Sequence, residues 1–530
     1  MAIGYKNLCD ALAFQQLNAL AKNNMMTLTL TASRLKSMTV PMGTGLFYNY
    51  AAKLVDEPIL TALQNLADEM DVVGQYRQLI AGAVMNGSEQ RRVLHHLTRG
   101  QLGPAVIAQG CDKRLFYEEQ RQRISDFAEK IHTGQLRGDT GKRFRHVCQI
   151  GIGGSALGPR SLYLALAHGA HCRDQQYMTA SFITNVDPDN AGQVLSELDL
   201  VSTLFIVVSK SGTTQETLTN EALVCHALQH AGLDPAAHLV AVTSEACSIA
   251  SGVNYLEHFY LDDFIGGRFS ATSAVGATLL TLTFGANVFA ALLDGAHHQD
   301  TLALNSCVTE NPALLDALIG VYERNCLGYG CSAVLPYSQP LIRFVAHLQQ
   351  LDMESNGKSV NREGVPLPYD SGPIIFGEPG TNGQHSFYQL LHQGTQIVPL
   401  QFIGFQHSQG GGDLQVDGST SQDKLNANLV AQIFAFANGQ PSSNPNTFFA
   451  GQRPSSLIYG EQLTPWVLGA LLAHFENKVM FQGFLWNINS FDQEGVQLGK
   501  RLTQQILTDH VDDEALKVLA EMLDIQTLHS

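Results

Sequence analysis

The spacing of apolar residues changes once along the chain, near residue 145. Before that point apolar side chains recur every three or four positions, for example from Glu57 to Met70 and from Val72 to Met85, and this spacing predicts helices. From His146 onward, short β-branched runs alternate with longer helical patterns, which predicts strand–helix–strand units around a parallel sheet. The expected fold class is therefore α/β with a helical N-terminal region.

The short apolar runs fall into two groups, so we expect two sheets. The first group comprises 147–152, 181–186, 203–208, 239–243 and 257–261. A run beginning at Ser273 follows, which we expect to form one long buried helix that closes the first unit near residue 290. The second group comprises 332–336, 373–376, 397–403 and 456–459. Segments 494–508 and 512–524 then predict two C-terminal helices, the second of them amphipathic.

Composition and charge narrow the classes of function. Hydrophobic residues make up 45% of the 530 residues and charged residues 15%, a balance typical of a chain that buries large cores. The net charge of −16 argues against general binding to nucleic acid or to an anionic membrane, because both are polyanions. No stretch reaches the roughly 18 uninterrupted apolar residues that a membrane span needs, so none is expected.

Cysteine and histidine usage points to a cytoplasmic protein without a metal. The nine cysteines include no Cys-x-x-Cys pair, and a chain of this length does not need disulfides to hold its core, so reduced thiols are expected. The first 24 residues have helical spacing with polar breaks, unlike a signal peptide. The pairs His95-His96 and His297-His298 lack a metal-ligand pattern, and we assign no metal.

A glycine-rich turn, GIGGSALGP, follows the first predicted strand. Gly153 and Gly154 make the turn and a helix begins near Ser155, so backbone amides at the helix start favour an anion such as phosphate. The motif also satisfies the dinucleotide-binding fingerprint, although Asp187, the first acidic residue at a strand end, comes later than that fingerprint requires. A structural turn that binds nothing is the third possibility, and the motif alone leaves all three open.

A second loop, SKSGTTQET, follows the predicted strand that ends at Val208. Hydroxyls, a lysine and backbone amides converge from Ser209 to Thr214 before a helix begins. This donor set suits a phosphate monoester and lacks the Gly-Lys-Ser/Thr ending of an ATP-binding loop. The alternative is helix capping by a hydroxyl beside a solvated lysine. Two such loops on neighbouring strands favour phosphate binding.

Two further segments carry titratable side chains. An apolar-striped helix ends in Asp352-Met353-Glu354, where the helix dipole disfavours negative charge and so favours a carboxyl group that accepts and returns protons. The alternative is a surface carboxylate, and spacing alone does not decide between them. His385 begins a helix after a glycine-rich loop, but it is one of 19 histidines and by itself proves nothing.

Six segments together resemble the phosphoglucose isomerase family: GIGGSALGP, SKSGTTQET, GGRFSATSAVG, QLDMESNGK, GEPGTNGQHSFYQ and FDQEGVQLGK. The resemblance runs from about residue 85 to Lys500. It implies two sugar-isomerase α/β domains, each a parallel sheet flanked by helices. We expect the chain to divide into four parts: a helical region packing on the second domain (1–120), the first domain (121–290), the second domain (291–508) and a C-terminal helix (509–530).

The resemblance also implies roles for individual residues. Glu354 resembles the base that carries a proton between C2 and C1, and Arg268 the cation beside the enediolate. His385 and Lys500 resemble the pair that opens the sugar ring. The implied substrate-binding residues are Gly154, Ser155, Ser209, Lys210, Ser211, Thr214, Gln350 and Gln493. The family resemblance implies a homodimer, with His385 contributed across the interface, and no cofactor.

This resemblance implies reversible isomerisation of glucose 6-phosphate to fructose 6-phosphate. Two alternatives remain at this stage: an isomerase that also uses mannose 6-phosphate, and a regulatory protein that binds sugar phosphates without catalysis. A dinucleotide-dependent oxidoreductase is a more distant third. Long members of the family often have phenylalanine at Gly212, an acidic residue at Ala156, and tryptophan at Thr272 and Glu494. We expect these departures to affect local packing and phosphate affinity.

Overall fold

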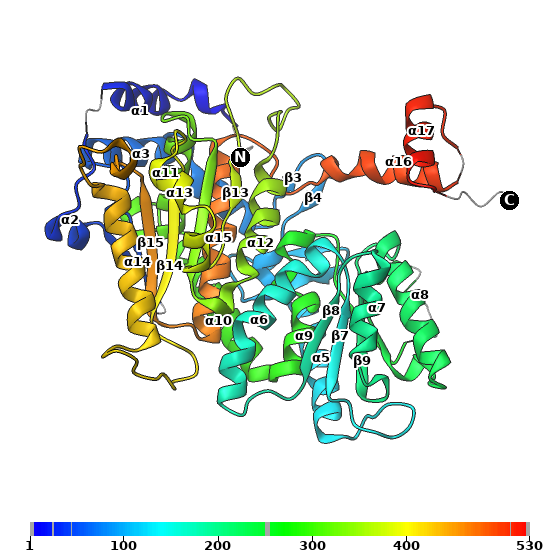
Figure 1. The fold of residues 1–530 in the computed structure, drawn as a ribbon. Coiled ribbons are helices and arrows are strands. Elements are labelled where there is room, and N and C mark those ends of the chain that lie inside the picture. The colour runs from blue at the N-terminus through cyan, green and yellow to red at the C-terminus, as the bar shows by residue number, and fades with distance from the viewer. Residues whose placement is uncertain are drawn as a thin grey trace. The chain divides into compact units, whose positions relative to one another are not determined.

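The computed structural model describes residues 5–23, 26–43, 45–247, 249, 255–508 and 510–525. The chain forms two compact units, Met1–Ser490 and Phe491–Ser530. The larger unit contains two large β-sheets with helices on their faces (Figure 1), and two further sheets of two short strands each. The α/β fold class predicted from the sequence is confirmed.

The first sheet is entirely parallel, in the order β11-β10-β9-β7-β8. Its strands are β7 (His146–Ile150), β8 (Thr179–Ile183), β9 (Thr203–Ser209), β10 (Leu239–Thr243) and β11 (Glu257–Tyr260). All seven residues of β9 are buried, because this apolar run lies at the centre of the sheet and is covered on both faces. These five strands lie where the sequence predicted them.

Helices cover both faces of the first sheet (Figure 1). On one face, α7 (Pro188–Ser196) and α8 (Gln215–His230) contribute Ala191, Val224 and Leu228 to the core beneath them. On the other face lie α5 (Lys113–Thr133) and α9 (Ala274–Phe284), with α6 (Leu157–Cys172) packed on α9. The carboxyl ends of the strands are therefore the open edge at which loops can meet a ligand.

The second sheet is mixed, in the order β1-β2-β15-β14-β12-β13. Its parallel strands are β12 (Cys331–Tyr337), β13 (Ile374–Phe376), β14 (Leu400–His407) and β15 (Ser455–Gln462). Two antiparallel strands, β1 (Thr39–Pro41) and β2 (Leu46–Asn49), extend it beyond β15. The apolar spacing predicted a purely helical N-terminal region, and this prediction is wrong. β2 gains its pairing from β15, far along the chain, and β1 pairs with β2.

Helices also cover the second sheet on both faces. On one face lie α13 (Tyr388–Gln393) and α14 (Ser421–Asn438), which share a core with β12 and β14. On the other lie α11 (Pro312–Asn325) and α15 (Pro465–Leu485), of which α15 is buried along most of its length. The remaining helices of the first 350 residues are α1 (Leu12–Asn23), α2 (Ala32–Ser37), α3 (Glu57–Glu69), α4 (Val72–Ile80), α10 (Ala286–Leu302) and α12 (Phe344–Gln349).

The apolar run after Ser273 forms two helices, and the prediction of one long helix is wrong. α9 ends at Phe284 and α10 begins at Ala286, because Gly285 between them has a φ of +86°, which lies outside helical geometry and favours glycine. Residue 290 lies inside α10, which packs along α15. The division of the chain into domains at residue 290 stays a prediction.

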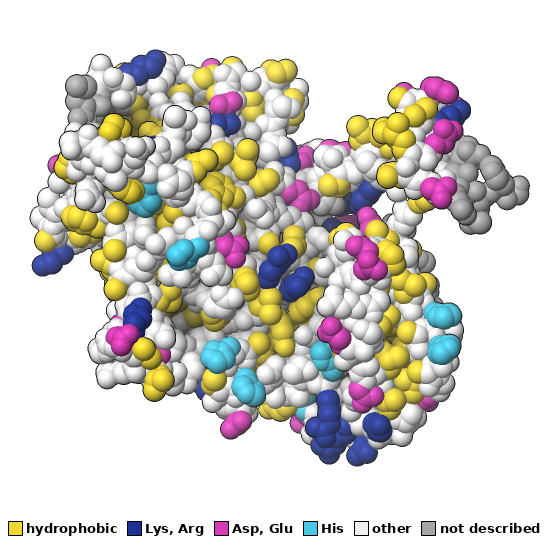
Figure 2. Space-filling model, in the orientation of Figure 1, with side chains coloured by type: hydrophobic (Ala, Val, Ile, Leu, Met, Phe, Trp, Pro, Cys, Tyr) yellow, Lys and Arg dark blue, Asp and Glu magenta, His cyan; other side chains and the backbone are white. Residues whose placement is uncertain are grey.

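The smaller unit contains α16 (Gln497–Leu507) and α17 (Glu514–Met522), which confirms both predicted C-terminal helices. Neither helix has a buried residue, and apolar side chains are exposed on both (Figure 2), including Leu498, Leu507, Leu519 and Met522. Among the helices that the structure describes, none is both long enough and apolar enough to cross a bilayer.

Candidate active site

The two glycine-containing loops predicted to bind phosphate emerge at the same edge of the first sheet. β7 and β9 are parallel neighbours, with Ile150 opposite Val207, so the segments after Ile150 and after Ser209 leave the sheet side by side. The first loop forms a short 3-10 turn, η3 (Gly153–Ser155), and the second leads into α8. This is the position where open α/β sheets bind ligands.

Gly154 brings the first loop against a third segment, η7 (Gly267–Thr272). A Cβ atom at position 154 would overlap the backbone of Gly267, so only glycine allows this approach. Ser270 Oγ also donates a hydrogen bond to the Gly154 carbonyl at 3.4 Å. Because η7 carries Arg268, this packing places the predicted cation beside the first loop.

The second loop is organised by its own hydroxyl groups. Ser209 Oγ donates to Thr214 Oγ1 at 3.2 Å, and Thr213 Oγ1 donates to Ser211 Oγ at 3.0 Å. Gly212 has a φ of +65°, and a Cβ at this position would meet Cys247 Sγ. The cysteine side chain therefore occupies the space beside this glycine.

Lys210 connects the second loop to the segment before Arg268. Its Nζ donates to the Ile265 carbonyl at 3.3 Å and lies 3.7 Å from Asp263 Oδ1. Burial lowers the pKa of Lys210, and the Asp263 carboxylate opposes that effect. An incoming phosphate would compete with Asp263 for this ammonium group, so the loop has a cation ready for an anionic ligand.

Glu354 faces Arg268 from the last turn of the helix that begins with α12. That turn is a π-helix, η10 (Gln350–Glu354), a distortion frequent at functional sites. Glu354 Oε1 lies 3.5 Å from Arg268 Nη1. The arginine side chain is 1% exposed and the glutamate side chain 20% exposed, so the carboxylate can reach a ligand while the guanidinium is fixed behind it. Gln350 lies beside Gly153, since a Cβ at 153 would be 3.3 Å from Gln350 Nε2.

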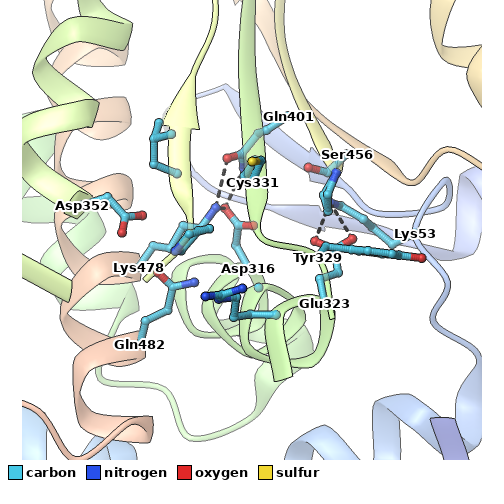
Figure 3. Close-up of a pocket in the computed structure, with 16 residues that line it drawn as sticks. Lys53, Asp316, Glu323, Tyr329, Cys331, Asp352, Gln401, Ser456, Lys478 and Gln482 are labelled. Atoms are coloured by element: carbon cyan, nitrogen blue, oxygen red, sulfur yellow. Dashed lines mark hydrogen bonds and ion pairs between the residues drawn. The ribbon is translucent and has the colours of Figure 1, made fainter. Parts of the chain in front are cut away.

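The opposite face of the same turn carries Asp352, which points into a buried polar cavity of about 30 Å³ (Figure 3). Two ion pairs line it: Lys478 Nζ lies 3.0 Å from Asp316 Oδ2, and Lys53 Nζ lies 2.9 Å from Glu323 Oε1. Burial raises the pKa of Asp352 to about 7, and Lys478 counteracts that effect. The cavity is far below the roughly 300 Å³ of small-molecule sites, so it is too small to be the substrate site.

The remaining predicted site residues are His385, Gln493 and Lys500. His385 ends a 3-10 turn, η11 (Asn382–His385), and is exposed. Within the described ranges it has no hydrogen bond or ion pair with another predicted site residue. Gln493 and Lys500 belong to the unit Phe491–Ser530, where Lys500 is exposed on α16. Their roles therefore stay predictions, as do those of the clustered residues.

Sequence reasoning missed the residues that hold Arg268 in place. Arg268 donates to the Ser355 hydroxyl and to the Ser490 carbonyl, and Ser490 donates to Asn356. Ser355 and Asn356 directly follow Glu354, which was an available signal in the sequence, whereas no sequence signal pointed to Ser490. Thr272 is buried and bonded: its Oγ1 lies 2.8 Å from Thr98 Oγ1 and accepts from Arg99 Nε at 3.3 Å. The described residues include no group of three or more His, Cys, Asp or Glu side chains arranged to hold a metal ion.

Comparison with known proteins gives concordant findings. The family model described as phosphoglucose isomerase matches residues 49–520. A glucose-6-phosphate isomerase from Treponema denticola is 55% identical over 527 residues, covering 98% of this chain and 99% of the relative. One from Borreliella burgdorferi is 47% identical over 520 residues, covering 97% and 98%. The crystal structure of a glucose-6-phosphate isomerase from Chlamydia trachomatis has a TM-score of 0.92 and 42% identity, covering 98% and 99%.

Proposed function

The chain belongs to the phosphoglucose isomerase family, and we propose that its active site lies where Glu354 meets Arg268 at the edge of the first sheet. The protein is an aldose–ketose isomerase that interconverts glucose 6-phosphate and fructose 6-phosphate, a step of glycolysis and gluconeogenesis. The observation that carries the proposed site is the 3.5 Å contact between Glu354 and the buried Arg268, beside two loops suited to phosphate.

The phosphate is the handle for the substrate. Ser209, Lys210, Ser211 and Thr214 bind it, with the amides at Gly154 and Ser155 beside them, and its binding energy positions the reacting carbons. His385 and Lys500 open the ring by moving the O5 and O1 protons. Gln350 and Gln493 contact the sugar. Ring opening has to come first, because the C2 proton becomes acidic only beside a free C1 carbonyl.

Glu354 then removes the proton from C2. The electron pair of the C2–H bond forms a C1–C2 double bond, and the C1 carbonyl oxygen takes the negative charge of a cis-enediolate. Arg268 stabilises this charge from a fixed, water-excluded position. The O2 proton passes to O1, and the protonated Glu354 delivers its proton to C1, which gives the 2-ketose. Side chains carry the ring-opening and carbon-bound protons, and the O2-to-O1 transfer occurs between substrate oxygens, so the proposed scheme invokes neither a metal nor a cofactor.

We also propose a cytoplasmic homodimer in which His385 reaches the active site of the partner subunit. Two observations support this proposal: His385 is exposed, and α16 and α17 carry exposed apolar side chains of the kind that a second subunit covers. All nine cysteines are free, as expected of a protein in a reducing compartment. Light scattering on the full-length chain measures the oligomeric state.

The test of the site is fructose 6-phosphate conversion, coupled to glucose-6-phosphate dehydrogenase, by wild type and Glu354→Gln in the presence of a chelator. We expect wild-type turnover to persist and the variant to lose several orders of magnitude in kcat while still binding substrate. Equal activity of the two proteins would remove Glu354 as the base.

Comparing mannose 6-phosphate with glucose 6-phosphate tests a broader substrate range. Tight sugar-phosphate binding without wild-type turnover would indicate a regulatory protein.

A further inference from the structure

The guanidinium group of Arg268 is held at all three nitrogens. Nη1 faces Glu354, Nε donates to Ser355 Oγ at 2.6 Å, and Nη2 donates to the carbonyl of Ser490 at 2.6 Å. Glu354 and Ser355 belong to the turn that bears the proposed base, whereas Ser490 comes from a distant part of the chain. The Ser490 carbonyl therefore holds Nη2, the guanidinium nitrogen that the turn itself does not bind.

Ser490 is in turn held by Asn356. Ser490 Oγ donates to Asn356 Oδ1 at 2.7 Å, and Asn356 Nδ2 donates to the carbonyl of Val479 in α15 at 3.1 Å. Ser490 is 2% exposed and Asn356 is fully buried, and hydrogen bonds in such a low-dielectric environment are strong. Arg268, Ser355, Asn356 and Ser490 thus form a closed ring, because Ser355 and Asn356 are joined by the backbone.

The ring also depends on the absence of a side chain. A Cβ atom at Gly483, in α15, would overlap Ser490 Oγ and would approach Asn356 Oδ1 to 3.3 Å. Any other residue at position 483 would therefore push the Ser490 hydroxyl away from Asn356. Gly483 lies in the last turn of α15, and glycine is a weaker helix former than alanine by up to about 1 kcal/mol, which fits a position that space, not helix propensity, determines.

We propose that Ser490 and Asn356 are positioning residues for Arg268, and that Gly483 provides the space they need. The inference rests on the proposed role of Arg268 beside the enediolate. A cation stabilises a developing charge only if it already points at the oxygen atoms, and a displacement of about 1 Å can cost about 100-fold in rate. The phosphate loops bind the substrate elsewhere, so displacing Arg268 affects kcat and leaves KM nearly unchanged.

The experiment compares Ser490→Ala and Gly483→Ala with wild type in the coupled assay. Ser490→Ala keeps the carbonyl that accepts from Arg268 but removes the bond to Asn356. We expect each variant to lower kcat by about 10- to 100-fold and to change KM by less than about threefold. Ser455→Ala is the matched control, since Ser455 is fully buried and, within the described residues, its hydroxyl has no hydrogen-bond partner. It should keep wild-type kcat.

Combining Ser490→Ala with Arg268→Lys separates positioning from general destabilisation. Lysine has no Nη2, so if Ser490 acts through Arg268, adding Ser490→Ala to the lysine variant leaves kcat unchanged, whereas a purely structural role makes the two losses multiply. Wild-type kcat in Ser490→Ala, while Arg268→Lys is slow, would overturn this inference and leave the proposed function standing. Wild-type kcat in Arg268→Lys would instead refute the role of Arg268 itself.

Discussion

Asp352 should make the stability of this protein depend on pH. Its carboxyl lies in the buried cavity behind the active-site turn, and its Oδ1 has no hydrogen-bond partner among the described residues. Lys478 is the opposite charge that acts on it, Asp316 the like charge, and Asn356 a hydrogen-bond partner. Lys478 and Asn356 favour the charged form, but burial outweighs them and raises the pKa of Asp352 from its ordinary 3.8 to about 7.

The sign follows from proton binding. Between pH 4 and 7 the folded protein holds this proton and the unfolded chain does not, so the free energy of unfolding falls as pH rises through this range and then stays level. The pKa of Asp352 rises from 3.8 to about 7, and each pKa unit corresponds to about 1.4 kcal/mol, so the proton adds about 4 kcal/mol to the free energy of unfolding at low pH. The part lost between pH 5.5 and pH 8 is about 2 kcal/mol.

Urea unfolding of wild type and Asp352→Asn at pH 5.5 and pH 8 measures this effect. The amide cannot ionise, so wild type should lose about 2 kcal/mol more than the variant between the two pH values. Asp370→Asn is the control, because the Asp370 side chain is 68% exposed and its neutralisation should leave the pH dependence as in wild type. Parallel changes in wild type and Asp352→Asn would refute the reasoning.

Three further predictions concern the loops and the buried ion pairs. Gly154→Ala should lower kcat/KM by at least about 100-fold, because its Cβ would displace the backbone of Gly267 and with it Arg268; unchanged steady-state kinetics would contradict the packing. Lys210→Ala should raise the Ki of inorganic phosphate as a competitive inhibitor by about tenfold, since a charge-assisted contact is lost, and an unaltered Ki would exclude Lys210 from the phosphate site. Arg99→Ala should lower the free energy of unfolding by about 3–5 kcal/mol, because it leaves Asp300 and Glu476 buried without their cation. Urea unfolding measures this loss. Arg123→Ala is the comparison: it breaks the half-exposed ion pair with Glu257 and should lower the free energy of unfolding by at most about 1 kcal/mol.

Local sequence determined the strands and the loops of the first sheet. The centre of the β9 run, LFIVV, is apolar and ends in three β-branched residues, a pattern typical of a central strand buried on both faces. The hydroxyl-rich segment after it follows directly in the chain, so its place at the carboxyl end of the strand was predictable. The same holds for Gly153 and Gly154 after β7, because parallel neighbouring strands bring their ends to one edge.

Only the tertiary structure decided which partners these residues have. Spacing could not tell whether Asp352 or Glu354 faces the site, since both end one helix, and the family resemblance alone favoured Glu354; packing buries Asp352 against Lys478 and leaves Glu354 beside Arg268. Strand β2 forms because β15 offers an edge to pair with, and β1 then pairs with β2. Ser490 reaches Arg268 only through the folded chain. Local propensity acts within a few residues, whereas these contacts join segments that meet only when the hydrophobic core is assembled.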